Sequence, residues 1–529
     1  MRLAYYDSLK WLRGIALEST GQEMYITQLL HRRAIENPNQ PITIYLDRVR
    51  TASESIERVS KLAGALRALG VAEGDRVGIL SLNSDRFHEF LFAAPWAGAI
   101  VNPVNTRWST AEIAYSLNDC DTRVLLVDSV FAAMLPKLRE LVPNLSVVIH
   151  CGEEATPDGT YDYEQLIKQA SPLEDVCRGG NELFGIFYTG GTTGNPKGVM
   201  LSHNSMILSA LGSLATCDIL SRNGSLLHVA PMFHLADIAA WVMGLIIGSE
   251  NVFLSGFTPR AVAEIVRKNQ ITDALLVPTM IQMLVDSTET SIEDFSSFRR
   301  IMYGASPISP SVLQRAQEKM KNAQFTQAYG MTELAPIATL LTFEDHKDPT
   351  LTRSAGRGTA IVDIRIENPD GVVLGRDEVG EIVVRGDNAM QGYWNKPEET
   401  ALALRDGWMH TGDAGYLDER GYLFVVDRIK DMIITGGENV YSTEVENAIT
   451  KHPSVATCAV IGLPDEIWGE KVHAVIVLRV GETVSEQELS EFCRDQIAGY
   501  KIPRSYAFVD SLPISGAGKI LKRELRDQK

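Results

Sequence analysis

Short apolar runs alternate with helix-forming segments from about residue 24 to 150, and again from about residue 225 to 330. Runs such as RVGILSL (76–82) and RVLLVD (123–128) have the length and composition of buried strands, whereas residues 52–70 carry apolar side chains at helical spacing. Parallel strands need a long crossover, which is usually a helix. The alternation therefore predicts an α/β fold with two similar, mostly parallel sheets.

The pattern changes twice in the last third of the chain. Residues 362–386 alternate β-branched and polar residues between turn signals, which predicts a small antiparallel, barrel-like β unit. Beyond Asp427, helix-like and strand-like segments alternate over about a hundred residues, enough for an independent α+β domain. We place the boundary between the two parts at DRIKDM (427–432).

Composition excludes several classes of function. The chain has 529 residues, 45% hydrophobic and 22% charged, as in ordinary soluble enzymes. Its net charge of −17 argues against a nucleic-acid partner, because binding a phosphodiester backbone requires a basic surface. The six cysteines are dispersed and form no C-x-x-C pair, which indicates neither a zinc site nor a disulfide framework and fits a reducing cytoplasm. The N-terminus lacks a clean apolar signal core and the apolar run 239–248 is short, so we expect neither export nor an integral membrane segment.

The stretch YTGGTTGNPKGVM (188–200) combines glycines, threonines and Lys197 between two strand-like runs. Glycines let backbone N–H groups approach an anion, threonines add hydroxyl donors, and the lysine adds positive charge. The residue order differs from that of the P-loop, because no hydroxyl follows the lysine and no helix begins there. Two interpretations stand at this point: a flexible surface loop, or a clamp for a polyphosphate that joins two strands.

Two further motifs could hold parts of a nucleotide. In QAYGMTE (327–333), Tyr329 could stack on a base, Thr332 could donate to a phosphate, and Glu333 could hold Mg²⁺. In the predicted hairpin at 410–431, Asp413 could bind a ribose diol next to Arg428. Taken singly, the first motif is more typical of a solvated turn, and the second is equally typical of a surface ion pair.

Two more motifs are ambiguous on local evidence. His234 lies in the apolar stretch PMFHLADIAAW, where a core histidine is the commoner outcome than a catalytic one. Lys519, Lys522 and Arg523 lie in SGAGKILKREL, which by itself indicates a turn followed by a basic, solvent-facing helix.

Taken together and in order, these five stretches resemble the core motifs of the adenylate-forming superfamily, which contains acyl-CoA synthetases, firefly luciferases and peptide-synthetase adenylation domains. The resemblance covers nearly the whole chain. It implies an N-terminal domain (1–427) of two α/β subdomains and a β unit, a hinge (428–432) and a mobile C-terminal domain (433–529). It also implies that a carboxylic acid reacts with ATP to give an acyl-adenylate and pyrophosphate, after which coenzyme A displaces AMP to form a thioester.

The resemblance also assigns roles to residues. Lys519 would bridge the carboxylate and the α-phosphate in the first step, Glu333 would hold Mg²⁺ with Thr192, and the C-terminal domain would then rotate about Lys430. His234 would act as a gate between acid and thiol, and Thr332 would contact the α-phosphate. The implied ATP and AMP site comprises Thr189, Gly190, Gly191, Thr192, Thr193, Gly194, Lys197, Ala305, Ser306, Gln327, Ala328, Tyr329, Gly330, Asp413, Val425, Arg428 and Lys519. The implied coenzyme A contacts are Gly436, Gly437 and Glu438. Gly191 departs from the family pattern, which often has serine or threonine there.

The sequence constrains the identity of the acid substrate less than it constrains the reaction. Peptide-synthetase domains usually have an aspartate at the position of His234, so an amino acid is disfavoured, although Asp237 lies three residues on. Hydroxycinnamate ligases tend to have a tyrosine where this chain has Ala236, which disfavours a hydroxyaryl acid. The remaining lining is apolar and suits an alkyl chain, so a medium- or long-chain fatty acid is the first choice. The expected acyl pocket is formed by His234, Leu235, Ala236, Trp241, Gly304, Ala305, Pro307 and Met331.

Several alternatives stay open. A short thioether, branched, aryl or alicyclic acid fits the same apolar lining, because one methylene discriminates by only about 1–3 kcal/mol. A luciferase-like oxygenase, an acyl-AMP ligase that feeds a carrier protein, and a catalytically silent nucleotide-binding module are the rival functions. The expected partners are a small carboxylic acid, ATP and coenzyme A, with a homodimer left open.

Overall fold

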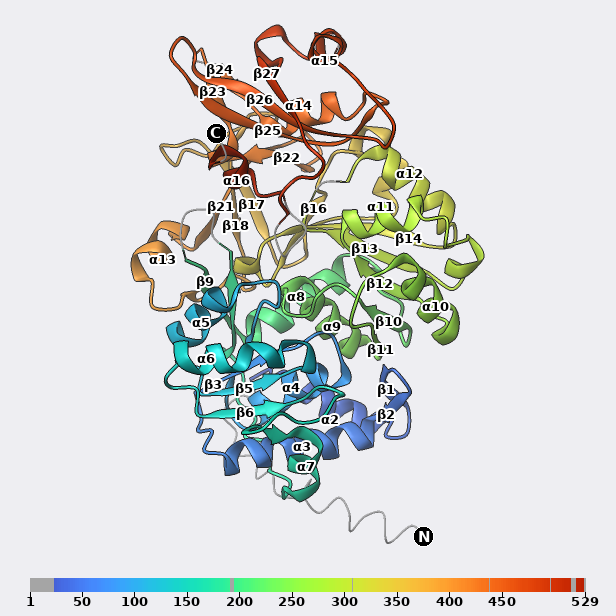
Figure 1. Cartoon of the computed structure of the whole chain (residues 1–529), viewed down its shortest axis with the longest axis vertical. Helices are drawn as coiled ribbons and strands as arrows, with labels where there is room; N and C mark the ends of the chain where they lie inside the picture. The colour runs from blue at the N-terminus through green and yellow to red at the C-terminus, as the bar shows by residue number, and fades with distance from the viewer. Residues whose placement is uncertain are drawn as a thin grey trace.

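The computed structural model describes residues 23–190, 195–306, 308–436, 438–494, 496–514 and 520–527. Within these ranges the strands form four sheets. Figure 1 shows the first α/β round, with α3, α4 and β3, at the bottom of the molecule, the second round, with β12 and β13, in the middle, and β23 to β27 with α14 and α15 at the top.

The first α/β sheet has eight described strands in the order β19-β9-β8-β4-β3-β5-β6-β7. The strands from β8 to β7 are parallel, and β9 and β19 are antiparallel additions at one edge. Strands β4, β5 and β6 are buried along their whole length, as expected for a parallel sheet covered on both faces. The bounds are β3 Arg76–Leu80, β4 Ile100–Pro103, β5 Val124–Val127, β6 Val147–His150, β7 Tyr161–Asp162, β8 Leu183–Thr189, β9 Lys197–Ser202 and β19 Gly392–Tyr393.

The second α/β sheet has nine described strands in the order β16-β15-β14-β13-β12-β10-β11-β1-β2. It is parallel from β14 to β1 and antiparallel at both edges. The bounds are β1 Pro41–Tyr45, β2 Arg48–Thr51, β10 Ser225–His228, β11 Glu250–Phe253, β12 Asp273–Leu276, β13 Arg300–Gly304, β14 Gln324–Gly330, β15 Ile337–Leu341 and β16 Arg357–Gly358.

Two smaller sheets complete the fold. The antiparallel β unit has the order β17-β18-β21-β20, with β22 also paired to β21, and the C-terminal sheet has the order β24-β23-β26-β25, with β27 parallel to β26. The bounds are β17 Asp363–Glu367, β18 Gly380–Arg385, β20 Leu404–Arg405, β21 Trp408–Leu417, β22 Leu423–Arg428, β23 Ile433–Thr435, β24 Glu438–Val440, β25 Val455–Asp465, β26 Gly469–Leu478 and β27 Ser505–Phe508.

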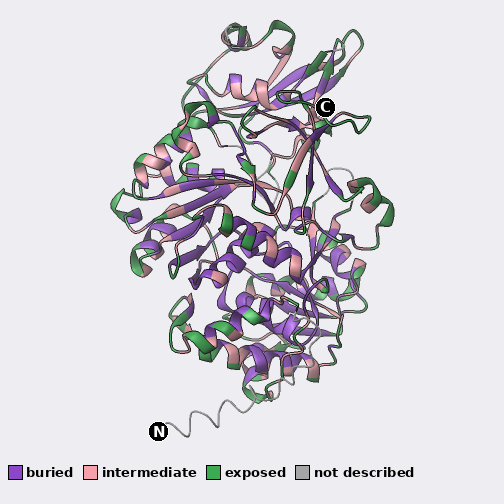
Figure 2. Cartoon of the chain, turned by 180° about the vertical axis from the view of Figure 1, so that it is seen from behind, coloured by how far each residue is buried: buried purple, intermediate pink, exposed green. Residues whose placement is uncertain are grey.

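Helices cover the sheets and meet in a shared core. The largest apolar cluster includes side chains of α4, α8 and α9 together with both α/β sheets, so these helices pack between the sheets. Figure 2 shows the buried strands and helices concentrated in this middle region. The described helices are α2 Thr27–Glu36, α3 Ala52–Ala68, α4 Asp85–Trp96, α5 Thr110–Asp119, α6 Leu135–Leu141, α7 Tyr163–Gln169, α8 His203–Thr216, α9 Leu235–Ile247, α10 Pro259–Asn269, α11 Pro278–Asp286, α12 Pro310–Lys319, α13 Pro397–Ala403, α14 Ser442–Ile449, α15 Glu486–Arg494 and α16 Lys522–Asp527.

The predicted fold class is confirmed, with one difference in how the strands are shared. Both parallel sheets, the antiparallel β unit and the C-terminal α+β part are present. The two rounds are not separate in space, however, because β1 near the N-terminus pairs with β11 of the second sheet, and β2 extends this edge by pairing with β1. The local apolar pattern reports that a strand exists but carries no information about its partner.

Candidate active site

The Gly/Thr stretch joins two antiparallel strands, as the sequence predicts. Thr189 at the end of β8 pairs with Lys197 at the start of β9. An added Cβ at Gly190 would meet no atom within 4 Å, so the backbone there is open to an approaching ligand. Gly191, Thr192, Thr193 and Gly194 lie outside the described residues.

The ends of β13 and β14 form the next part of the site. Gly304 pairs with Ala328, and a Cβ added at Gly304 would lie 2.1 Å from the Ala328 carbonyl oxygen, so only glycine allows this approach. Ala305 follows with a positive φ of 67°, a conformation that non-glycine residues rarely adopt and that often occurs at functional sites. Ser306 comes next and Pro307 lies outside the described residues. Gln327 accepts a hydrogen bond from the Tyr303 hydroxyl at 3.4 Å.

Glu333 lies in a short 3₁₀ turn, Thr332–Leu334, directly after β14. Its side chain is buried, and its Oε1 accepts a hydrogen bond of 2.8 Å from the hydroxyl of Tyr393. Lys197 contacts the ring of the same tyrosine, with its Nζ 4.8 Å from the ring centroid. The structure therefore brings the lysine of the Gly/Thr stretch and the carboxylate of YGMTE to one aromatic side chain.

A single buried carboxylate fits Mg²⁺ bound together with a nucleotide. Magnesium in such sites is commonly held by one or two carboxylates, substrate phosphates and water. Within the described ranges, no cluster of three or more histidine, cysteine, aspartate or glutamate side chains could hold a metal by itself. The buried carboxylate of Glu333 fits this kind of site, and its predicted role as a Mg²⁺ ligand together with Thr192 stays a prediction.

The predicted ribose site is assembled across two sheets. Asp413 on β21 faces Arg428 on β22, with an Oδ1 to Nε distance of 2.9 Å, and its Oδ2 accepts a hydrogen bond of 2.8 Å from the Tyr329 hydroxyl. Burial and the Asp413 charge raise the pKa of Tyr329, so this hydroxyl stays protonated and remains a donor. Val425 pairs with Gly415 in the same hairpin. The tyrosine predicted to flank the adenine thus also orients the carboxylate predicted to bind the ribose.

The segment that precedes His234 in the second α/β sheet is held by Asn83, which follows β3 of the first sheet. Asn83, between β3 and α4, donates to the carbonyl oxygens of His228 (3.1 Å) and Ala230 (2.8 Å) and accepts from the Met232 N–H (2.8 Å). These bonds hold the connection from β10 to α9, whose first residue Leu235 follows His234. His234 and Ala236 are partly exposed, as is Met331 after β14.

Two polar contacts define the buried face of α9. Asp237 is fully buried, and its Oδ2 lies 2.8 Å from Nδ1 of His228. This carboxylate oxygen therefore has its partner inside the protein. Trp241 is also fully buried, and its indole N–H donates to Nδ1 of His88 on α4 at 2.9 Å. The indole of Trp241 thus contacts α4. The proposal that Trp241 also lines the acyl pocket stays a prediction.

The predicted hinge and coenzyme A residues lie on the C-terminal side of the site. Lys430 is in a 3₁₀ turn, Ile429–Asp431, between β22 and β23. Gly436 has a positive φ of 61° and donates its N–H to the Trp468 carbonyl oxygen at 2.8 Å, and Glu438 begins β24. Gly437 and Lys519 lie outside the described residues.

Family models decide the classification. The model described as AMP-binding enzyme matches residues 30–394, and the model described as AMP-binding enzyme C-terminal domain matches residues 444–519. The chain belongs to the AMP-binding enzyme family. This AMP-binding enzyme is a member of the AMP-forming acyl-CoA ligases of the adenylate-forming superfamily, which confirms the resemblance found in the sequence.

Curated relatives and a solved structure agree with this classification. The AMP-binding enzyme is 38% identical over 501 residues to feruloyl-CoA synthase of Amycolatopsis sp, covering 94% of this chain and 97% of the relative. It is 35% identical over 470 residues to long-chain-fatty-acid–CoA ligase FadD13 of Mycobacterium tuberculosis, covering 89% and 91%. It also resembles the structure of o-succinylbenzoate CoA synthetase (MenE) from Bacillus subtilis in complex with the acyl-adenylate intermediate OSB-AMP, with a TM-score of 0.83 and 32% identity over 94% of this chain and 98% of that one.

Two residues that contact the candidate site of the AMP-binding enzyme were not predicted from the sequence. Tyr393 touches both Lys197 and Glu333, and Asn83 holds the segment before His234. A Gly-Tyr-Trp tripeptide after a turn (392–394) and an asparagine before a helix are common features, so neither stands out locally. Only the tertiary contacts identify them.

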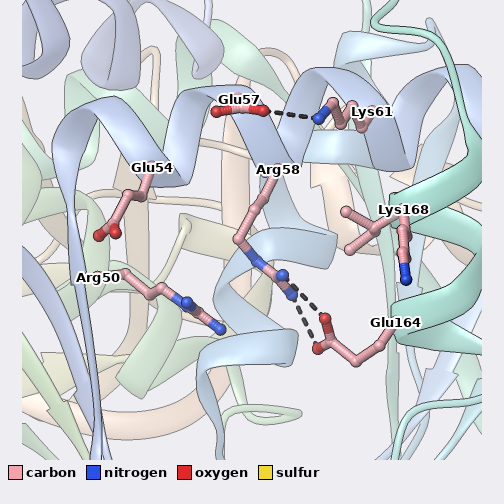
Figure 3. Close-up of a pocket in the computed structure, with 8 residues that line it drawn as sticks. Arg50, Glu54, Glu57, Arg58, Lys61, Glu164 and Lys168 are labelled. Carbon is pink, nitrogen blue, oxygen red and sulfur yellow. Dashed lines mark hydrogen bonds and ion pairs between the residues drawn. The ribbon is translucent and has the colours of Figure 1, made fainter.

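Charged side chains line two surface hollows. A cavity of about 390 Å³ is lined by side chains of β2, α3 and α7. Figure 3 shows Arg58 directed at Glu164 across it and Glu57 paired with Lys61. A second hollow is lined by residues 360–363, 385–387 and 407. In the described part of the chain, no helix combines the length and apolar character needed to cross a membrane.

Proposed function

We propose that this enzyme activates a carboxylic acid with ATP to an acyl-adenylate and pyrophosphate, and then transfers the acyl group to coenzyme A with release of AMP. The observation that carries the proposal is the convergence of Lys197, Glu333, Tyr329, Asp413 and Arg428 at neighbouring strand ends and turns. Ligands of open α/β sheets commonly bind beyond the carboxyl ends of the strands.

In the first step two anions must approach each other, so positive charge has to be in place where negative charge develops. Lys197 and the backbone of 189–194 would bind the β- and γ-phosphates, and Thr332 and Lys519 would bind near the α-phosphate. Bound Mg²⁺ supplies additional charge neutralisation of the phosphates. Glu333 would hold that ion, and the carboxylate oxygen of the acid would attack the α-phosphorus as pyrophosphate leaves.

The nucleoside would be oriented by residues of the second α/β sheet and of the antiparallel β unit. Asp413 has one carboxylate oxygen on Arg428 and the other on Tyr329, a preorganised acceptor for a ribose diol. Ala305, Ser306, Gln327, Ala328, Gly330 and Val425 are proposed to surround the base and the α-phosphate from the ends of β13, β14 and β22.

We propose a medium- or long-chain fatty acid as the substrate. Ala236 offers no hydrogen bond to a phenol, and Asp237 is engaged with His228 in the core, so it is not placed to bind a substrate ammonium group. Gly304, Ala305, Pro307 and Met331 are proposed to complete an apolar lining with His234 and Leu235. The long-chain relative from Mycobacterium tuberculosis supports this choice.

A hydroxycinnamate is the second candidate. The feruloyl-CoA synthase relative shares 38% identity over nearly the whole chain, and this observation favours an aryl acid. We further propose that the enzyme works in the cytoplasm, a setting consistent with its six cysteines, all of which are free thiols.

Acid-dependent pyrophosphate release tests the proposal. Purified enzyme is supplied with ATP, Mg²⁺ and a panel of octanoate, palmitate, ferulate, phenylacetate and amino acids, with and without coenzyme A, and the E333Q variant serves as control. We expect release with the fatty acids and acyl-CoA formation only when coenzyme A is present. Preference for ferulate would replace the fatty acid by the second candidate, and absence of release with every acid would leave a silent nucleotide-binding module.

A further inference from the structure

The segment from residue 386 to 394 connects two parts of the candidate site that are distant in sequence. On one side, the Met390 N–H donates to the Glu333 carbonyl oxygen at 2.8 Å. On the other side, the Trp394 N–H donates to the Gly198 carbonyl oxygen at 2.8 Å, and Tyr393 pairs with Val199. The segment therefore fixes the turn that contains Glu333 relative to the strand that follows the Gly/Thr stretch.

Asn388 strengthens the first of these attachments. It is fully buried, and its side-chain amide donates to the carbonyl oxygens of Leu334 (2.7 Å) and Ile337 (3.0 Å). The backbone around Glu333 is thus held on both sides of its turn, which leaves the side chain of Tyr393 as the contact that orients the carboxylate itself.

Tyr393 binds the two charged groups at different parts of its ring system. Its hydroxyl donates to Glu333 Oε1 at 2.8 Å, and Lys197 Nζ lies 4.8 Å from its ring centroid, within the range of a cation–π contact. Both the tyrosine and the glutamate are more than nine-tenths buried. Among the described residues, no ion pair joins Lys197 to Glu333, although both groups contact Tyr393.

We infer that Tyr393 is a positioning residue for adenylation: it directs the Glu333 carboxylate toward the metal of Mg·ATP and keeps Lys197 from neutralising that carboxylate. This inference rests on the proposed roles of Glu333 and Lys197. A buried carboxylate next to a free ammonium group in a region of low dielectric would form a direct ion pair, and each charge would then be less available to the nucleotide. The aromatic ring takes the ammonium on its face, while the hydroxyl leaves one oxygen of Glu333 for the ion.

The chain contains a matched control for this interaction. Tyr163 is also a buried tyrosine whose hydroxyl donates to a buried glutamate, Glu89, at 2.6 Å, but it lies in α7 next to Arg58. Removing the hydroxyl of Tyr163 therefore measures the cost of losing such a hydrogen bond outside the candidate site.

The experiment compares Y393F, Y393L, Y163F and E333Q with the wild-type enzyme. Binding of Mn²⁺ is followed by electron paramagnetic resonance in the presence of the α,β-methylene analogue of ATP, and binding of the metal-free analogue is measured by calorimetry. The magnesium dependence of pyrophosphate exchange and the thermal unfolding temperature are recorded for each variant.

We expect Y393F to weaken Mn²⁺ binding about 10- to 100-fold, the range typical of residues that orient a metal-binding carboxylate, with little change in binding of the metal-free analogue. Y393L should weaken both, because Lys197 loses its ring as well. Y163F should bind Mn²⁺ and the analogue as the wild type does, even if it unfolds at a lower temperature. If Y393F binds Mn²⁺ as the wild type does while E333Q loses Mn²⁺ binding, the role of Tyr393 is overturned and that of Glu333 stands. If E333Q binds Mn²⁺ as the wild type does, the proposed role of Glu333 is overturned, and the role of Tyr393 with it.

Discussion

At the scale of single residues, Lys519 is the group that we predict to act in only one of the two half-reactions. We expect K519A to lower acyl-adenylate formation roughly 10²- to 10³-fold, the usual effect of removing one charge that stabilises the transition state. Thioester formation from supplied acyl-adenylate and coenzyme A should remain near the wild-type rate, because in the predicted cycle the lysine leaves before the thiol enters. Single-turnover assays of each half-reaction measure the two rates, and an equal loss in both would contradict this assignment.

A second feature at the residue scale is His88, which makes the free energy of unfolding depend on pH. It is fully buried on α4 and accepts a hydrogen bond from the Trp241 indole, and burial together with the nearby His228 lowers its pKa to about 3. The unfolded chain binds this proton near pH 6.5, whereas the folded protein does not. The free energy of unfolding should therefore fall as the pH drops from about 6.5 toward 3, by up to about 1.4 kcal/mol per pH unit for this group.

Urea unfolding of variants at pH 5 to 8 tests the contribution of His88. The variant H88Q keeps an acceptor for the indole and should show a shallower loss of stability with acid. The control W241F loses the hydrogen bond but retains the histidine, so it should be less stable at each pH with an unchanged slope. His203, whose pKa burial lowers to about 4, should supply part of the slope that remains in H88Q. An unaltered slope in H88Q would exclude His88 as a source of the acid sensitivity.

At the scale of elements, Asn83 sets the connection between β10 and α9. N83A leaves two carbonyl groups and one N–H in this buried segment without their partner, which we expect to cost about 3 kcal/mol of stability. Because this segment leads into His234, the KM for the acid should rise several-fold more than the KM for ATP. Steady-state kinetics and urea unfolding measure the two effects, with N204A as control, since Asn204 bonds Asn181 near the surface. Equal changes in both KM values would indicate a general loss of structure.

Most elements could be predicted from the sequence, but their partners could not. The runs RVGILSL and RVLLVD became β3 and β5 because buried parallel strands need continuous apolar residues, and the Gly/Thr stretch joins β8 to β9 as expected. The pairing of β1 with β11 and the contact of Tyr393 with Glu333 depend on residues about 200 and 60 positions apart. No local period encodes such contacts, so they required the structure.

At the scale of the whole molecule, the predicted hinge lies in the 3₁₀ turn that contains Lys430, between β22 and β23. Proline fixes φ and also restricts the preceding residue, so K430P should oppose rotation of the C-terminal sheet about this turn. We expect thioester formation to fall at least about tenfold while adenylation changes little, since in the predicted cycle only the second half-reaction follows a rotation. K430A, which leaves the backbone free, is the control, and the two half-reactions are measured separately. Unchanged thioester formation in K430P would refute rotation at this residue.

Asp427 links the two sides of this turn in the present orientation. It lies on β22, yet its Oδ2 accepts hydrogen bonds from the Ser442 hydroxyl at 2.6 Å and from the backbone N–H groups of Ser442 and Thr443. These N–H groups belong to the first turn of α14 in the C-terminal part, where a carboxylate satisfies unpaired donors and interacts favourably with the helix dipole. Lys522 adds to the contact by donating to the Ser442 hydroxyl while paired with Glu446 at 2.8 Å. The predicted rotation about Lys430 would move α14 relative to β22 and would break these bonds.

Replacing Asp427 should therefore shift the balance between domain orientations. Loss of a helix cap costs about 0.5–2 kcal/mol, so D427A should disfavour the present orientation by roughly 2- to 30-fold. The half-reaction that uses this orientation should slow, whereas the other should keep its rate or become faster, because its orientation is more populated. The control D427N retains an acceptor for the N–H groups and should lie between D427A and the wild type. Single-turnover rates of both half-reactions, with small-angle X-ray scattering to follow the domain arrangement, provide the measurement. A parallel slowing of both half-reactions would show that Asp427 supports the fold in every orientation and does not select one of them.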